Sequence, residues 1–282
     1  MEMQKTIAES VNISGIGIHS GKSVDIQLMP ANLNTGITFK SQNNQSIKAI
    51  FENVHCTNMS TKLSSGNFSV DVVEHLMAAI WSLGIDNLII QVNSVEIPIL
   101  DGSSIQFIDI IRKIGLKTQS ATRKTLVVKQ PIEITDADKY VRILPNSNEG
   151  IIIEMSIDFQ HQVIGKQQII FDSTKNSFIN EFAFARTFGF TKDIEYLHSN
   201  GLALGASLNN CIGLTDTAVA NPEGLRCSDE FVRHKVLDCV GDLFLSGYYM
   251  NCIVIAHKTG HTLNNLALRE LFENQNNYII YE

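Results

Sequence analysis

Hydrophobic residues recur along this chain in two patterns, which predict two kinds of element. Short apolar or alternating runs are typical of β-strands, and they occur at residues 6–8, 24–28, 36–39, 87–92, 125–129, 140–144, 150–157, 168–171 and 251–256. Apolar residues spaced three and four apart predict helices, and they occur at 71–83, at about 104–114, at 192–199 and at 229–246. Shorter helices are expected from residue 176 and at the C-terminus. Strands and helices are therefore mixed along the chain.

The predicted helix 229–246 combines an apolar stripe with a second, polar pattern. His234 and Asp238 lie off the stripe and are four residues apart, so they are neighbours on one face. A His and a carboxylate one turn apart can supply two ligands to a metal ion from one rigid element. Asp242 follows one turn later, where it can orient a group near this pair. The same spacing also suits a surface ion pair, and the helix alone does not decide between the two interpretations.

The helix at 71–83 also has polar residues in an apolar context. Its apolar positions are dense, which predicts burial, and Gly84 is expected to end it. Glu74 and His75 lie near its first turn. A buried Glu and His without partners are costly to desolvate, so a functional role for this pair has the same weight as a structural one.

A weak internal repeat relates these two helices. Residues 74–84 and 233–247 each begin with a polar pair, continue as an apolar helix, stop at a glycine and lead into a strand. The polar, weakly patterned segment 115–124 lies between them and is the best linker candidate. We therefore predict an α+β protein of two similar domains, 1–120 and 125–282, each a β-sheet packed against helices in a layered sandwich. The active site is expected between the domains.

Composition narrows the class of protein. The 282 residues are 44% hydrophobic and 18% charged, which is typical of a globular chain. The net charge of -7 and the absence of any Lys or Arg run argue against nucleic-acid binding. No apolar run reaches membrane-spanning length, and the N-terminus lacks the pattern of a signal peptide. The five cysteines form no Cys-x-x-Cys motif, which fits a reducing cytoplasm and leaves His and carboxylates as metal ligands.

His75, His234 and Asp238 together match the ligand set of a catalytic zinc ion, which leaves one position open for water. Glu74, next to a ligand, is then a candidate general base. His261, in an apparently mobile segment at 259–264, is a candidate acid that Asp242 could orient. The residues alone do not favour His75 and His261 over the other histidines, which are His19, His55, His161, His198 and His257.

Seven sequence blocks resemble the family of UDP-3-O-acyl-N-acetylglucosamine deacetylases, the zinc amidases that commit the lipid A pathway of Gram-negative bacteria. The blocks follow one another over nearly the whole chain, at residues 15–21, 73–79, 96–103, 185–190, 193–197, 229–243 and 259–265. The resemblance implies that His75, His234 and Asp238 hold one zinc ion and that Glu74 is the general base on the attacking water. It further implies release of acetate and a free amine.

The resemblance also implies roles around the metal. His261, supported by Asp242, is the cation that stabilises the transition state and protonates the departing amine. Thr187 hydrogen-bonds the developing oxyanion, a typical preorganised stabiliser. These three residues complete the implied catalytic set.

Four further residues are implied to bind the substrate. Lys235 meets the nucleotide phosphates, Phe159 stacks on the uracil, Phe188 contacts the sugar and His19 lies near the substrate. The segment from about 194 to 214 is implied to take the fatty acyl chain, and its apolar residues suit that role: Leu202, Leu204, Ala206 and Leu208. The same apolar residues, considered alone, are also what a structural core uses.

Two alternative functions remain open at this point. One is a zinc hydrolase of another amide, such as a peptide, although Lys235 and the 194–214 segment have no obvious use there. The other is a protein that binds an acyl-sugar nucleotide without catalysis, although binding needs neither Glu74 nor His261. We expect a cytoplasmic monomer in either case.

Overall fold

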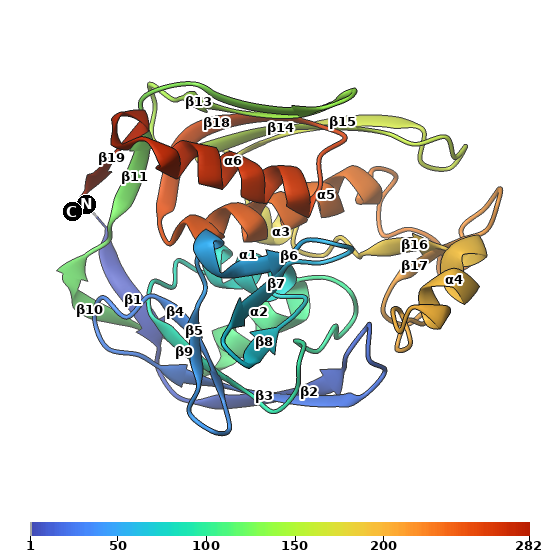
Figure 1. Cartoon of the computed structure of the whole chain (residues 1–282), viewed down its shortest axis with the longest axis horizontal. Coiled ribbons are helices and arrows are strands. Elements are labelled where there is room, and N and C mark those ends of the chain that lie inside the picture. Colours follow the sequence, from blue (N-terminus) through green and yellow to red (C-terminus); the bar gives the residue numbers. More distant parts are fainter. Residues whose placement is uncertain (1) are drawn as a thin grey trace.

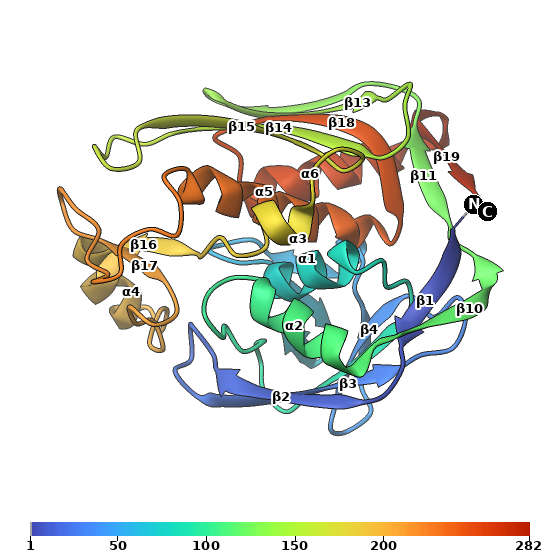
Figure 2. The same cartoon turned by 180° about the vertical axis from the view of Figure 1, so that it is seen from behind.

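The computed structural model describes residues 2–282, and these form four layers, with a sheet on each outer side and helices between them (Figures 1 and 2). This is the predicted α+β layered sandwich. The inner layers contain the four long helices, which are α1 (Glu74–Ser82), α2 (Ile105–Ile114), α5 (Glu230–Leu243) and α6 (His261–Glu273). Helices α1 and α2 lie over one sheet, whereas α5 and α6 lie over the other. Helix α1 packs on α5, so the two helical layers meet at the centre.

The N-terminal sheet has five strands in the order β2-β3-β9-β4-β5. Its strands are β2 (Val11–Ile16), β3 (Ser23–Pro30), β4 (Ile37–Ser41), β5 (Ser46–Lys48) and β9 (Leu88–Val92). All neighbours are antiparallel except β4 and β9, which are parallel. Buried and less buried residues alternate along β9. This alternation is expected where helices cover one face of the sheet and the other face meets solvent.

The C-terminal sheet is built around β18 (Tyr249–His257), which pairs with three other strands. The remaining strands are β11 (Thr125–Val128), β12 (Ile132–Asp136), β13 (Lys139–Pro145), β14 (Ile151–Asp158), β15 (Lys166–Asp172) and β19 (Tyr278–Tyr281). Strict alternation of burial along β14 and β18 turns their apolar side chains towards α5 and α6. The predicted strands at 125–129, 140–144, 150–157, 168–171 and 251–256 are confirmed. The sequence pattern missed β12 and β19.

Smaller elements surround the helical layers. Strands β6 (Val54–Cys56), β7 (Lys62–Ser65) and β8 (Phe68–Val70) form a small antiparallel sheet. On the side away from the termini, β16 (Phe188–Phe190) and β17 (Ile212–Leu214) pair in parallel, and α4 (Ile194–Ser199) lies between them in sequence (Figure 1). We call residues 188–214 the insert. A short helix, α3 (Phe178–Glu181), precedes it. Residues 47–70 predict further strand and loop, which agrees with β6, β7 and β8, whereas the sequence pattern missed β16 and β17.

The segment 115–124 is not the unstructured linker that its polar composition suggested. Residues Leu116–Thr122 form β10, which pairs antiparallel with β1 (Met3–Ile7). A polar strand of this kind is stable because β1 satisfies its backbone hydrogen bonds, not because it buries a face. Throughout residues 2–282, no strand before Arg123 pairs with a strand after it. This pattern supports the division into domains 1–120 and 125–282, which stays a prediction.

The repeated helix–glycine–strand units are present and meet each other. Helix α1 ends before Gly84, and α5 continues through a short 3-10 turn to Gly247. Both glycines have positive φ, +70° and +80°, which is the usual way to end a helix. The chain then enters β9 after α1 and β18 after α5. The two units thus bring the first turn of α1 against the last turns of α5.

A glycine allows this close approach. A Cβ atom at Gly241 on α5 would lie 2.1 Å from the carbonyl oxygen of Glu74 and 2.8 Å from its carbonyl carbon. Both are backbone atoms, which cannot move without moving α1. The sequence therefore determines at Gly241 how closely α1 and α5 can pack.

We predict that Gly241→Ala separates α1 from α5 and lowers the free energy of unfolding by about 1–3 kcal/mol, the usual cost of overpacking a core. Gly189→Ala is the matched control, because a Cβ there meets nothing within 4 Å. Denaturant unfolding of both variants measures the difference. Equal stability of the two variants would contradict the close packing at Gly241.

Within residues 2–282, none of the helices is both long and apolar enough to cross a bilayer.

Candidate active site

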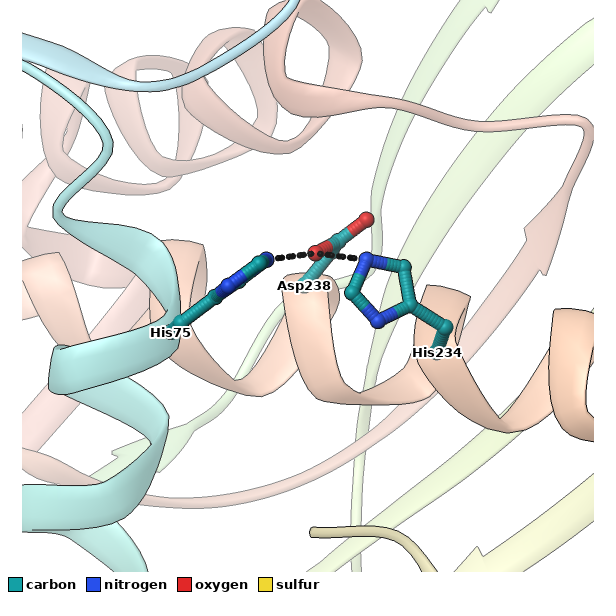
Figure 3. A group of neighbouring side chains, drawn as sticks. All are labelled: His75, His234 and Asp238. Atoms are coloured by element: carbon teal, nitrogen blue, oxygen red, sulfur yellow. Dashed lines mark ion pairs between the residues drawn. The ribbon is translucent and has the colours of Figure 1, made fainter. Parts of the chain in front are cut away.

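Two helices from different halves of the chain bring together three side chains that could hold a metal ion. His75 comes from α1, whereas His234 and Asp238 come from one face of α5 (Figure 3). Asp238 Oδ1 lies 3.3 Å from His234 Nε2 and 3.5 Å from His75 Nε2. Their candidate ligand atoms all lie within 4.8 Å of one another, and all three residues are buried. This is the set that the spacing on α5 suggested for His234 and Asp238 and that the family resemblance completed with His75.

Helix α5 differs from the prediction in one respect, because it is buried on nearly every side. Twelve of its fourteen residues are buried, including His234, Asp238 and Asp242. The reason is its position between β14 and β15 on one side and α1 on the other. The surface ion-pair interpretation of His234 and Asp238 is therefore wrong.

The protonation of His234 suits a metal ligand. Its Nδ1 lies 3.0 Å from the carbonyl oxygen of Ala185, and since a carbonyl only accepts, Nδ1 carries the proton. The lone pair of Nε2 then faces Asp238. Burial lowers the pKa of His234 to about 3, so the imidazole is neutral at physiological pH. A neutral imidazole held by a carbonyl is the usual state of a metal-binding His.

The unpaired atoms of the cluster are consistent with a metal site. In residues 2–282, four buried side-chain polar atoms lack a hydrogen-bond partner, and Asp238 Oδ1 and His75 Nδ1 are two of them. A buried carboxylate oxygen without a donor is unfavourable unless a cation compensates it. Two imidazoles and one carboxylate are also the donors that a catalytic zinc ion takes. The residues present therefore fit zinc.

Lys235 is hydrogen-bonded to Asp238 of the same cluster. Its Nζ donates to Asp238 Oδ2 at 2.8 Å and lies 5.5 Å from the centre of the Phe188 ring. Burial works to lower the pKa of Lys235, but the Asp238 carboxylate outweighs it and leaves the pKa raised. Lys235 is therefore a cation next to the cluster.

Glu74 begins α1 and lies next to the cluster with its carboxyl buried. Its Oε2 accepts the backbone N–H of Thr61 at 3.0 Å. Burial raises the pKa of Glu74 to about 7, although the neighbouring His261 and His75 oppose this. A carboxyl with a pKa near neutrality can take a proton and return it, which is the requirement for a general base.

His261 lies opposite Glu74 and is held by Asp242. Its Nδ1 donates to Asp242 Oδ2 at 2.8 Å, and its Nε2 lies 3.9 Å from Glu74 Oε1. Burial alone would lower the pKa of His261, but the carboxylates of Asp242 and Glu74 outweigh it and raise the pKa to about 10. His261 is therefore a cation at neutral pH.

The surroundings of His261 differ from the prediction. We expected a mobile segment at 259–264 followed by a short helix, but His261 is the first residue of the 13-residue α6. Asn264, one turn later, donates to Asp242 Oδ2 at 2.8 Å and accepts from the Thr259 hydroxyl. The loop prediction was wrong because Gly260 and Thr259 suggested a turn, whereas Gly260 is the N-cap of the helix.

Sequence reasoning missed Thr61, which binds Glu74 and also the Asp242 carboxylate that holds His261. Its N–H binds Glu74, and its hydroxyl donates to Asp242 Oδ1 at 2.6 Å. No periodic pattern or motif marked it, because it lies between β6 and β7. Only the three-dimensional structure reveals its position.

Thr187 lies on a segment that is tied to the metal cluster. Its N–H donates to the Gly102 carbonyl at 2.8 Å, and Ala185, two residues earlier, accepts from His234. Arg186 is buried and forms an ion pair with Glu230 at 2.9 Å. Ala185 and Arg186 are thus tied to His234 and Glu230 in the first two turns of α5. Sequence reasoning also missed the Arg186–Glu230 pair.

Phe159 and Phe188 lie beside the cluster and contact each other. Their ring centres are 5.7 Å apart in an edge-to-face arrangement, and Phe188 lies 6.3 Å from the His234 ring. Both rings are half-buried. The structure therefore brings Phe159, Phe188 and Lys235 together next to the metal ligands.

His19 contacts the insert. Its carbonyl accepts the N–H of Leu204 at 3.0 Å, and its own N–H donates to Glu96 at 3.0 Å. The predicted glycine-rich connection at 14–21 is only partly a loop, since β2 extends to Ile16. Buried Glu96 also accepts from Ser20, so it fixes the loop that meets the insert. Sequence reasoning assigned no role to Glu96.

A buried His–His–Asp cluster flanked by a buried Glu and a His–Asp pair is the kind of site that metal-dependent hydrolases use. Residues 4–273 match the family described as UDP-3-O-acyl N-acetylglycosamine deacetylase. The chain belongs to this family, whose members are metalloenzymes.

Several curated relatives are similar over their full length. A UDP-3-O-acyl-N-acetylglucosamine deacetylase from Geotalea uraniireducens is 44% identical, over 100% of this chain and 92% of the relative. Proteins of the same name from Citrifermentans bemidjiense and Pseudoalteromonas atlantica are 42% and 41% identical. These two alignments cover 100% and 98% of this chain, and 93% and 92% of the relatives. The resemblance seen in the sequence blocks is confirmed.

Proposed function

We propose that this protein hydrolyses the acetamide of UDP-3-O-acyl-N-acetylglucosamine with one zinc ion per chain. Water and the amide give acetate and UDP-3-O-acyl-glucosamine, the committed step of lipid A biosynthesis. The observation that carries the proposal is the meeting of His75, His234 and Asp238 with Glu74 and His261, in a chain of this deacetylase family. We further propose that the enzyme is a cytoplasmic monomer with the site between domains 1–120 and 125–282.

His75, His234 and Asp238 are proposed to hold the zinc. When bound, zinc supplies a Lewis acid that makes water nucleophilic near neutral pH and polarises a carbonyl. The hydrogen bond from His234 to the Ala185 carbonyl keeps the ring in the required tautomer and orientation. Asp238 remains next to the Lys235 cation, which favours the ionised carboxylate that a metal requires.

Glu74 and His261 are proposed to share the proton transfers. Glu74 removes a proton from the attacking water as the C–O bond forms, and its pKa near 7 suits that task. His261, a cation held by Asp242, faces the same space and stabilises negative charge on the reacting carbonyl. When the C–N bond breaks, His261 gives its Nε2 proton to the departing amine. Thr187 is proposed to donate to the developing oxyanion.

Substrate recognition is proposed to use the residues beside the cluster. Lys235 attracts the diphosphate as a point charge, which allows an acidic protein to bind an anion. Phe159 stacks on the uracil and Phe188 contacts the sugar. The part of the insert from about residue 194 to 214 is proposed to take the acyl chain, next to His19. Its exposed Leu204 and Leu208 support this, because neighbouring exposed apolar side chains often mark a binding surface.

The alternative functions explain less of the site. A protein that only binds an acyl-sugar nucleotide gains nothing from burying Glu74 next to His261, since desolvating both groups is unfavourable. A peptide hydrolase has no use for Lys235 beside two aromatic rings or for the apolar insert. The deacetylase proposal uses all of these features.

Mass spectrometry of the products tests the proposal. We expect zinc-loaded protein to convert UDP-3-O-acyl-N-acetylglucosamine into UDP-3-O-acyl-glucosamine and equimolar acetate. An N-acetylated peptide, offered at the same concentration, is expected to remain intact. Hydrolysis of the peptide alone favours the other hydrolase, whereas binding of the sugar nucleotide without turnover favours the binding protein.

A further inference from the structure

Thr61 is hydrogen-bonded to both carboxylates that face His261, those of Glu74 and Asp242. It is 1% exposed. Its N–H donates to Glu74 Oε2 at 3.0 Å and its hydroxyl to Asp242 Oδ1 at 2.6 Å. Glu74 belongs to α1 and Asp242 to α5. One residue therefore holds a carboxylate from each half of the chain.

Each carboxylate turns its other oxygen towards His261. Glu74 Oε1 lies 3.9 Å from His261 Nε2, and Asp242 Oδ2 lies 2.8 Å from His261 Nδ1. Because a carboxylate is planar, fixing one oxygen fixes the direction of the other. Thr61 thus determines, through the far oxygens, how both carboxylates meet the imidazole.

The backbone at Thr61 is itself held in place. Ser60 donates its hydroxyl to Asp71 at 2.6 Å, and the Thr61 carbonyl accepts the N–H of Val73 at 3.3 Å. Thr61 is also β-branched, which restricts its χ1 rotamers. A short, charge-assisted hydrogen bond from a restricted side chain is a strong orienting contact.

The oxygen that Thr61 binds has no substitute donor. Asn264 and His261 both donate to Asp242 Oδ2, so the hydroxyl of Thr61 is the one donor to Oδ1 within residues 2–282. Removing it leaves a buried carboxylate oxygen unsatisfied, and Asp242 is then held at Oδ2 alone.

We propose that Thr61 is a positioning residue that orients Glu74 and Asp242 about His261. It donates to both carboxylates and acts through them, not on the substrate. The inference rests on the proposed deacetylase function. It predicts a defect in turnover that leaves substrate affinity and zinc content unchanged.

Thr61→Val and Thr61→Ser test the proposal, with acetate release, KM and zinc content measured for both. Thr61→Val keeps the shape and the N–H but loses the hydroxyl, so we expect kcat to fall about 10- to 100-fold, as for other orienting partners. We expect unchanged KM and one zinc per chain. Thr61→Ser, which keeps the hydroxyl, is expected to restore most of kcat. If Thr61→Val does not fold, Thr61→Ala is measured in its place with the same expectations.

The outcomes separate this inference from the function on which it rests. If the wild-type protein is active and Thr61→Val has the same kcat, the proposed role of Thr61 is contradicted and the proposed function is not. The role of Thr61 is also contradicted if kcat falls equally in Thr61→Val and Thr61→Ser, or if Thr61→Val loses its zinc. A zinc-loaded wild-type protein that releases no acetate contradicts the proposed function, and the inference falls with it.

Discussion

His234→Ala and Asp238→Ala proteins are expected to lose stoichiometric zinc. Each substitution removes one of the three proposed ligands from a buried site, and Asp238 Oδ1 lies between the two imidazoles. A four-ligand structural site binds zinc with about 10–16 kcal/mol, so one ligand contributes roughly 3 kcal/mol, or about a hundredfold in affinity. Elemental analysis after dialysis against a weak chelator measures the effect.

The matched control is His55→Ala, which removes an exposed histidine from β6. We expect this variant to retain one zinc per chain and wild-type activity. Full zinc occupancy in the His234→Ala protein would mean that the metal is held elsewhere and would overturn the ligand assignment.

Glu74→Gln is expected to keep its zinc and lose turnover by about 10²- to 10⁴-fold, the usual contribution of a general base. The substitution is nearly isosteric, and the amide oxygen can still accept the N–H of Thr61, so the fold and the adjacent His75 should be undisturbed. An amide, however, cannot take a proton from water. Steady-state kinetics with parallel zinc analysis separate catalysis from metal binding.

Glu52→Gln, at an exposed position, is the control for loss of a carboxylate and is expected to leave kcat unchanged. A Glu74→Gln protein with near wild-type kcat would assign the general base to another group. A Glu74→Gln protein without zinc would instead make Glu74 part of the metal site.

Local patterns predicted most helices and most strands of both outer sheets, because burial of one face imposes a period that the sequence records. The same patterns failed where an element is stabilised by its neighbours. Strand β10 is polar and exists because β1 pairs with it. The insert strands β16 and β17 have three residues each, too few to show a period.

The site shows the same limit. His234 and Asp238 could be paired from sequence because both lie on one helix, one turn apart. Choosing His75 and His261 from eight histidines required the family resemblance, because their proximity depends on how α1, α5 and α6 pack. Thr61 left no signal, and Glu96 stood in a family block without an assigned role, since each acts through hydrogen bonds to residues distant in the chain.

Zinc titration of the chelated protein tests the central claim most directly. The rate of acetate release from UDP-3-O-acyl-N-acetylglucosamine is followed as zinc is added to metal-free enzyme. We predict a negligible rate without metal, a linear rise and a plateau at one zinc ion per chain. Full activity of the metal-free protein, or no activity at any zinc concentration, would contradict a zinc-dependent deacetylase built on His75, His234 and Asp238.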